Sequence, residues 1–177
     1  MMPQYLIKAI SLEMTNLYFK EEQRFRQWWL WLILIAVALI PVNGVIQQVI
    51  RDQQFGDNPL SDFGLIFLLI FMIGFLALFW MMKLSTEIDD ASIKMNFYPF
   101  TKKEIKWTEI ESAEVLNYGF VGGWGIRLGT KYGTVYNTSG KIGLAIILKN
   151  KEKFCIGTIK ESELKALISE AKQQKKF

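Results

Sequence analysis

The sequence predicts a membrane-anchored protein, in which a hairpin of two apolar helices is followed by an α+β domain of antiparallel strands and one helix. Three observations lead to this fold class. Two long apolar runs lie in the first half of the chain, short alternating runs fill most of the second half, and an amphipathic stretch ends it. Because 51% of the 177 residues are hydrophobic and 21% are charged, the two classes must be concentrated in different segments. One domain and an anchor fit this length.

The second apolar run is the clearer membrane span. Residues 63–82 read FGLIFLLIFMIGFLALFWMM and contain no charged or amide side chain. A helix of this length crosses a hydrocarbon core of about 30 Å. The first run, 28–48, contains Pro41, Asn43 and Gly44 near its end, which membrane helices tolerate, and we expect a kink near Pro41. A secretory signal is the less favoured interpretation, because no small-residue cleavage pattern follows the run.

The polar loop 51–62 joins the two runs into a hairpin comprising residues 28–82, and the flanking charges predict its orientation. Basic residues stand on both outer flanks, whereas the loop offers only Arg51. The flanking residues are Lys20, Arg24, Arg26, Lys83 and Lys94. Positive charge favours the cytoplasmic side, so we expect both chain ends inside and a multi-pass protein of a prokaryotic inner membrane, with the lipid bilayer as a partner. Four tryptophans are predicted as interfacial anchors on the same side: Trp28, Trp29, Trp31 and Trp80.

Residues 83–177 predict a cytoplasmic domain of about seven antiparallel strands, capped by a C-terminal helix. The segments LSTEID, SIKMNFYPF and EIKW alternate apolar and polar residues, with a turn at Asp89 and Asp90. The segment KIGLAIILKNKEKFCIGT is a second hairpin, which turns at Asn150 and Lys151. The final stretch ESELKALISEAKQQKK repeats apolar residues at helical spacing. At the other end of the chain, we expect the cytoplasmic segment 1–27 to form a short helix that enters the membrane.

Several of these segments resemble a known family. The strand pair TEIDDASIKMNFYPF, the element EIKWTEIESAEV, the loop GGWGIR and the final IGTIKESELKALI are similar to the bacterial pleckstrin-homology-like domain. That domain occurs in small membrane proteins of unknown function with an N-terminal helical hairpin, and EEQRFRQWW extends the likeness into the hairpin. In eukaryotic relatives, basic residues around the first loop between strands hold lipid headgroups. The resemblance puts Asp89 and Asp90 in that loop, which argues against specific inositol-phosphate binding.

The residues offer little for catalysis. The chain has no histidine, which removes the usual general base and zinc ligand. Its single cysteine, Cys155, lies between Phe154 and Ile156 and is predicted to be a buried strand residue. The acidic residues Glu87, Asp89 and Asp90 form either a metal or acid-base cluster or, as we favour, a solvated turn. The sequence therefore predicts no catalytic, cofactor-binding or metal-binding residue.

Two surfaces are candidates for binding a partner. A glycine-rich region carries the first candidates, Tyr118, Phe120, Trp124, Arg127 and Tyr132. The alternative for these rings is that they fill the core. Basic residues form the second group of candidates, which face either anionic lipid or only solvent. They are Arg24, Arg26, Lys102, Lys103 and Lys106.

The leading functional hypothesis is a non-enzymatic, membrane-anchored interaction or scaffold module, whose partner is the lipid surface or another membrane or cytoplasmic protein. An accessory subunit of a membrane transport or export complex is the alternative, and a membrane enzyme with a convergent polar cleft is the third. Nucleic acid is not an expected partner, because lysines alternate with glutamates and no recognition module is present.

Overall fold

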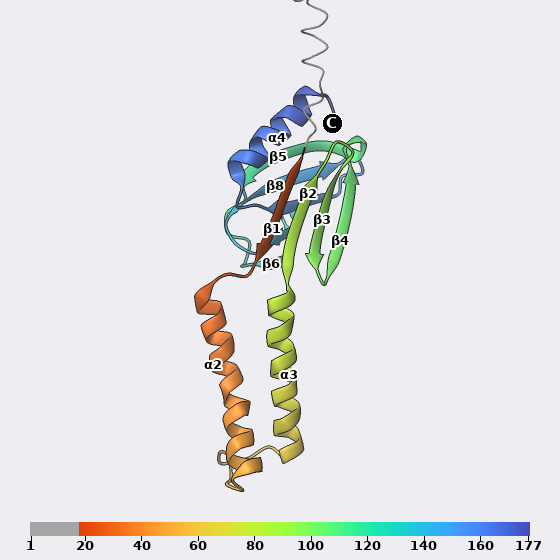
Figure 1. The fold of residues 1–177 in the computed structure, drawn as a ribbon. Helices are drawn as coiled ribbons and strands as arrows, with labels where there is room; N and C mark the ends of the chain where they lie inside the picture. The colour runs from red at the N-terminus through yellow and green to blue at the C-terminus, as the bar shows by residue number, and fades with distance from the viewer. Residues whose placement is uncertain (1–17) are drawn as a thin grey trace, which may run out of the picture. The chain divides into compact units, whose positions relative to one another are not determined.

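The computed structural model describes residues 18–177, which form two compact units. One unit is the helical hairpin, Phe25–Met82, and the other combines residues 18–24 with Lys83–Phe177. The hairpin is therefore inserted between two parts of one β unit (Figure 1).

The hairpin contains two helical stretches that are long and apolar enough to cross a membrane. The first, Trp28–Ile50, consists of α2 (Trp28–Gly44) and the π-helical turn η1 (Val45–Ile50), and the second is α3 (Asp62–Met81). Their mean hydropathies are 2.3 and 2.7, as the sequence leads us to expect. Ser61 is the N-cap of α3, because its hydroxyl accepts a hydrogen bond from the Gly64 N–H at 3.2 Å.

Close packing between the helices depends on Gly44. A Cβ atom added at Gly44 would lie 2.9 Å from Cδ2 of Leu65 on α3 and 3.1 Å from the ring of Phe55. The sequence instead points to Asn43, Gly74 and Ala77 as packing residues. Asn43 and Ala77 are exposed, and an added Cβ at Gly74 would meet nothing within 4 Å. These three residues therefore do not make the close contacts between α2 and α3.

The β unit contains nine strands within the described residues, in two sheets. Eight of them lie in residues 83–177, for which the sequence predicts about seven. Sheet A has the order β1-β2-β3-β4, formed by Phe19–Arg24, Lys83–Ile88, Ser92–Tyr98 and Thr101–Lys106. Sheet B has the order β5-β8-β9-β7-β6, in which β5 is Ile110–Asn117, β6 is Gly125–Thr130, β7 is Gly133–Asn137, β8 is Ile142–Leu148 and β9 is Lys153–Gly157. The neighbours are antiparallel except for β7 and β9, which are parallel. A 3-10 turn, η2 (Trp107–Glu109), connects the two sheets.

The core of the β unit lies between the two sheets and the C-terminal helix α4, Glu161–Gln173 (Figure 1). Alternation along the strands places fully buried side chains on the inner faces, including Leu84, Met95 and Phe97 of sheet A. The helix contributes its apolar stripe, which consists of Leu164, Leu167, Ile168 and Ala171. The amphipathic helix, both predicted hairpin turns and most predicted strands are thus confirmed. The two sheets and helix α4 together form the predicted α+β arrangement.

The predicted helix over residues 1–27 is wrong where the structure describes it, because Phe19–Arg24 forms strand β1. Residues 1–17 lie outside the described residues. β1 pairs with β2 in antiparallel register, so that Arg24 faces Lys83 and Phe19 faces Ile88. Its alternating burial places Phe19, Glu21 and Gln23 inside. Two of these three inward side chains are polar, so the segment lacks the apolar alternation by which strands are predicted.

Buried hydrogen bonds satisfy the polar side chains of β1. The Glu21 carboxylate accepts from the Thr158 hydroxyl at 2.7 Å and from the Ile159 N–H at 2.8 Å. The Gln23 amide donates to the Gly157 carbonyl at 2.8 Å and accepts from the Thr138 hydroxyl at 3.3 Å. These bonds join β1 to sheet B and to the start of α4, and a buried carboxylate without them would be costly.

The Thr158 hydroxyl provides a test of this attachment. Replacing Thr158 by Val leaves one Glu21 oxygen without its buried donor, and the free energy of unfolding should fall by about 1–3 kcal/mol. Thr86→Val is the matched control, because Thr86 is equally buried and its hydroxyl has no hydrogen-bond partner within the described residues. That control should be neutral or stabilising. Urea unfolding of the full chain in detergent micelles measures both, and equal effects of the two substitutions would contradict the assigned role of β1.

Candidate functional site

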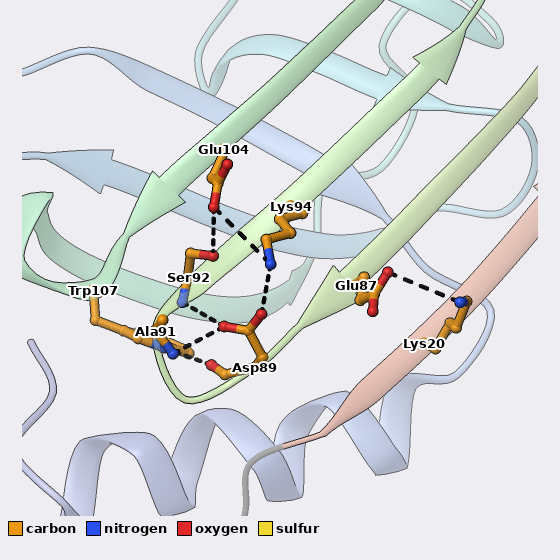
Figure 2. Close-up of polar contacts among 8 residues, drawn as sticks. All are labelled: Lys20, Glu87, Asp89, Ala91, Ser92, Lys94, Glu104 and Trp107. Carbon is orange, nitrogen blue, oxygen red and sulfur yellow. Dashed lines mark hydrogen bonds and ion pairs between the residues drawn. The ribbon is translucent and has the colours of Figure 1, made fainter.

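The predicted acidic cluster lies at the turn between β2 and β3, and each of its three carboxylates has a lysine partner. Figure 2 shows the pairs of Glu87 and Asp89. Asp89 pairs with Lys94 at 2.7 Å, and its carboxylate also accepts from the N–H groups of Ala91 and Ser92. Glu87 faces Lys20 of β1 at 3.9 Å. Asp90 pairs with Lys176, which follows α4, at 2.6 Å. The cluster thus holds the turn and attaches the C-terminal segment to it.

Electrostatics at Asp89 agree with a structural role. The hydrogen bond from Lys94 and the two backbone N–H donors hold the pKa of Asp89 below its ordinary value of 3.8, against the opposing effect of partial burial. The same contact raises the pKa of Lys94. Beside the turn, the indole N–H of Trp107 donates to the Asp89 carbonyl at 2.8 Å. The ring of Trp107 stacks on Phe177 with centroids 5.6 Å apart.

Cys155 lies at the centre of a second, smaller core on sheet B. This outer core consists of the buried residues Tyr118, Val135 and Cys155, against which Leu116, Val121, Tyr132 and Ala145 pack. Cys155 is fully buried on β9, as predicted, and burial raises the pKa of its thiol to about 12. The thiol therefore stays protonated at physiological pH and is a poor nucleophile.

The glycine-rich aromatic surface is not one surface. Tyr118 is only 4% exposed, and its hydroxyl donates to the Gly140 carbonyl and accepts from Asn137, so its assignment to an exposed surface is wrong. Phe120, by contrast, is 82% exposed. Trp124, Arg127 and Tyr132 are half-buried. Tyr132 packs on the outer core.

Arg127 folds back onto its own loop. Its Nη2 donates to the Trp124 carbonyl at 2.7 Å, and this position requires the glycine at residue 123. A Cβ atom added at Gly123 would lie 2.7 Å from that nitrogen, and the backbone φ there is +115°. The guanidinium therefore stabilises the loop. Phe120 alone among the five candidates remains a prominent apolar contact point.

The four interfacial tryptophans gather at one end of the hairpin unit. Trp31 and Trp80 contact edge to face, with ring centroids 6.0 Å apart, and thus join the start of α2 to the end of α3. The Trp31 indole donates to the Phe25 carbonyl at 3.0 Å. Trp28 and Trp80 are 74% and 69% exposed, whereas Trp29 is less so. The exposed indoles stand where the apolar helices end, which is the position of interfacial anchors.

The five basic candidates separate into different environments. Arg24 pairs with Glu22, and Lys103 pairs with Glu152. Lys102 and Lys106 both point outward from β4, but at opposite ends, because Lys102 pairs in register with Asn96 and Lys106 with Ser92. Arg26 is exposed beside the start of α2. Strand register thus places Lys106 beside the β2–β3 turn, whereas Arg24 and Lys102 lie at the other end of sheet A.

One end of sheet A brings together two sequence candidates, Arg24 and Lys102, and two exposed aromatic residues that the sequence did not single out, Tyr98 and Phe100. We call this the junction end; it consists of Arg24, Lys83, Tyr98, Phe100 and Lys102. Here β1 leads into the hairpin and β2 leads out of it, and Lys83 is paired with both Arg24 and Tyr98. Tyr98 and Phe100 are 40% and 54% exposed. The aromatic turn YPF directly after an alternating strand was the signal, but only the register shows which end of the sheet it occupies.

The chain matches no family model, no curated protein and no solved structure. Its resemblance to the bacterial pleckstrin-homology-like domain therefore stays a prediction. The junction end has two exposed aromatic rings and the basic side chain of Lys102, at the end of sheet A where the chain enters and leaves the hairpin; it is the candidate functional site.

The pKa of Asp89 leads to a test of the turn. A carboxylate whose pKa is lowered in the folded state contributes stability above its ordinary pKa, and that contribution is lost as the pH falls through the lowered value. The melting temperature should therefore fall more steeply in the wild type than in Asp89→Asn between about pH 5 and about pH 3. In a Lys94→Met background the difference should shrink. Thermal melting in detergent micelles measures this, and identical pH profiles for the wild type and Asp89→Asn would contradict it.

Proposed function

We propose that this protein is a membrane-anchored interaction module, whose helical hairpin holds the β unit at the cytoplasmic face of a prokaryotic inner membrane. The pairing of β1 with β2 carries the proposal, since these two strands are separated in the chain by the entire hairpin yet form one sheet. The steps below give the support for an anchor, for its orientation and for a domain that binds a partner.

Exposure of the apolar side chains supports insertion into lipid. Core helices of soluble proteins bury such residues, but only 11% of each apolar window is buried here. Phe63, Phe67 and Ile70 on α3 are 80%, 62% and 63% exposed. Removing each such side chain from water contributes about 1.5–3 kcal/mol, so the hairpin gains far more in a bilayer than in solution.

Strand pairing constrains the topology. The residues of β1 precede the hairpin and those of β2 follow it, so both flanks of the hairpin lie on one side of any membrane that it crosses. Two crossings satisfy this requirement and a single crossing does not. The excess of basic residues on the flanks then favours the cytoplasm for that side.

The β unit also fits a pleckstrin-homology-like domain, which we include in the proposal. Two mostly antiparallel sheets followed by one C-terminal helix support it, and the chain adds two insertions to that plan. The hairpin of β6 and β7 lies between β5 and β8, and the membrane hairpin lies between β1 and β2. On this interpretation the first connection between strands is the membrane hairpin, and the turn at Asp89 is the second.

Site-directed labelling tests the anchor and its orientation. Single cysteines replace Asp57 in the loop, Tyr18 before β1 and Asn150 between β8 and β9, and the cells are treated with a membrane-impermeant maleimide. We expect labelling of Asp57→Cys in intact cells, and of the other two only after permeabilisation. The wild type is the control, because the buried, protonated Cys155 should not react. Labelling of Asn150→Cys in intact cells, or extraction of the protein by alkaline carbonate, would refute the proposal.

A photoreactive residue tests the interaction role. Phe120 is the most exposed aromatic side chain of the described β unit, and a photoreactive amino acid in its place should give a discrete adduct with a second protein in native membranes. Asn150, also exposed, is the matched control position and should give none. Immunoblotting detects the adducts. Equal adducts at both positions, or none at Phe120, would count against a protein partner at this loop.

A further inference from the structure

The turn between β3 and β4 has exposed aromatic side chains, although it belongs to a soluble β unit. We propose that this turn, Tyr98 to Phe100 with Lys102, is a second membrane contact that inserts into the headgroup layer of the leaflet holding the hairpin. The inference rests on the proposed function, because it requires the hairpin to be in a membrane. Its occupant is the lipid interface itself.

Chain connectivity limits how far the turn can be from the bilayer. Lys83 is two residues beyond Met81, the last residue of α3, and two extended residues span about 7 Å. Tyr98 is the register partner of Lys83, and paired Cα atoms are about 5 Å apart. These steps add to about 12 Å, whatever angle the β unit takes to the hairpin. The interfacial layer extends about 5–8 Å beyond the hydrocarbon on each side, so Tyr98 stays at or near that layer.

The turn presents side chains that suit this layer. Phe100 is held outward by its backbone, since its N–H donates to the Phe97 carbonyl at 2.8 Å, and its ring contacts the buried Phe97 with centroids 6.3 Å apart. The neighbouring Tyr98 combines an apolar ring with a hydroxyl, and such rings collect at the boundary between hydrocarbon and water. Phe100 therefore has a fixed support, and both rings have an exposed face.

Charge supports the same partner. The Lys102 side chain is exposed on the outer face of β4, and its ammonium group forms no ion pair or hydrogen bond within residues 18–177. An ammonium group at this level is available to a lipid phosphate. Lys83, the other lysine of the junction end, is already paired with Glu22 at 2.7 Å.

The turn at the opposite end of the same sheet has no exposed aromatic side chain. The turn between β2 and β3 carries Asp89, Asp90 and the small Ala91, and no large hydrophobic side chain at that turn is exposed. It lies the length of β2, about 20 Å, from Lys83. Basic groups lie at both ends of sheet A, and two lysines are paired with Asp89 and Asp90 at the far end. Of the two turns, only the one at the junction end carries exposed aromatic rings, which distinguishes the two turns as surfaces for a lipid interface.

An environment-sensitive dye tests the proposal in the full chain. The fluorophore NBD is attached to Phe100→Cys or, as the matched control, to Ala91→Cys, and each protein is reconstituted into vesicles of equal parts phosphatidylcholine and phosphatidylglycerol. At position 100 we expect blue-shifted emission and several-fold stronger quenching by nitroxide-labelled lipid than at position 91. In the Lys102→Gln background, quenching at position 100 should weaken. Vesicles of phosphatidylcholine alone should give the same weaker value with or without that substitution.

The outcomes separate the two proposals. If alkaline extraction releases the labelled protein from the vesicles, the hairpin is not an anchor and the proposed function fails. If the protein stays in the vesicles but the dye at position 100 emits as it does at position 91, the anchor stands and the second contact is refuted. An unlabelled Phe100→Ser variant provides an independent measurement, because hydrogen exchange of residues 97–102 in vesicles should be faster than in the wild type. Unchanged exchange would also overturn the inference.

Discussion

The pairing of β1 with β2 is the constraint on which the rest of the structure depends. It brings Arg24 and Lys83 together although the whole hairpin separates them in the chain. The segments before and after the hairpin are thereby held in one sheet, and the hairpin is an insertion between two strands of the β unit. The pairing of β2 with β3 positions Tyr98 beside Lys83, so the turn that follows Tyr98 lies close to the point where the chain leaves the hairpin.

The energetics of β1 are unusual for a strand at the edge of a sheet. Its inner face carries Glu21 and Gln23, and hydrogen bonds from Thr158, Ile159 and Thr138 replace the water that these groups lose. Satisfied buried polar groups add geometric specificity more than raw stability, because a shifted register would leave a carboxylate unpaired. These contacts therefore fix which segment joins the edge of sheet A. They also explain how a polar hexapeptide takes part in the core.

The two ends of sheet A carry different groups: ion pairs at the β2–β3 turn and exposed aromatic rings at the junction end. At the far end, ion pairs to Lys94 and Lys176 use the carboxylates of Asp89 and Asp90 to hold a turn and the C-terminal segment. At the junction end, exposed aromatic rings and Lys102 have no comparable role in the fold. These exposed groups, at the end of sheet A where the chain enters and leaves the hairpin, are the basis of the proposed membrane contact.

The sequence by itself determined the features that depend on local patterns: both apolar helices, the hairpin turns at Asp89 and Asn150, the buried Cys155 and the amphipathic helix α4. Periodicity and turn chemistry act over a few residues, so they can be read directly. Only the tertiary structure decided the features that depend on distant partners. β1 is a strand because Leu84 and Thr158 complete it, Gly44 packs because of where Leu65 faces, and Tyr118 is buried because β7 and β9 close over it. Register likewise decided that Tyr98 lies beside Lys83 at one end of sheet A, and no short stretch of sequence contains that register.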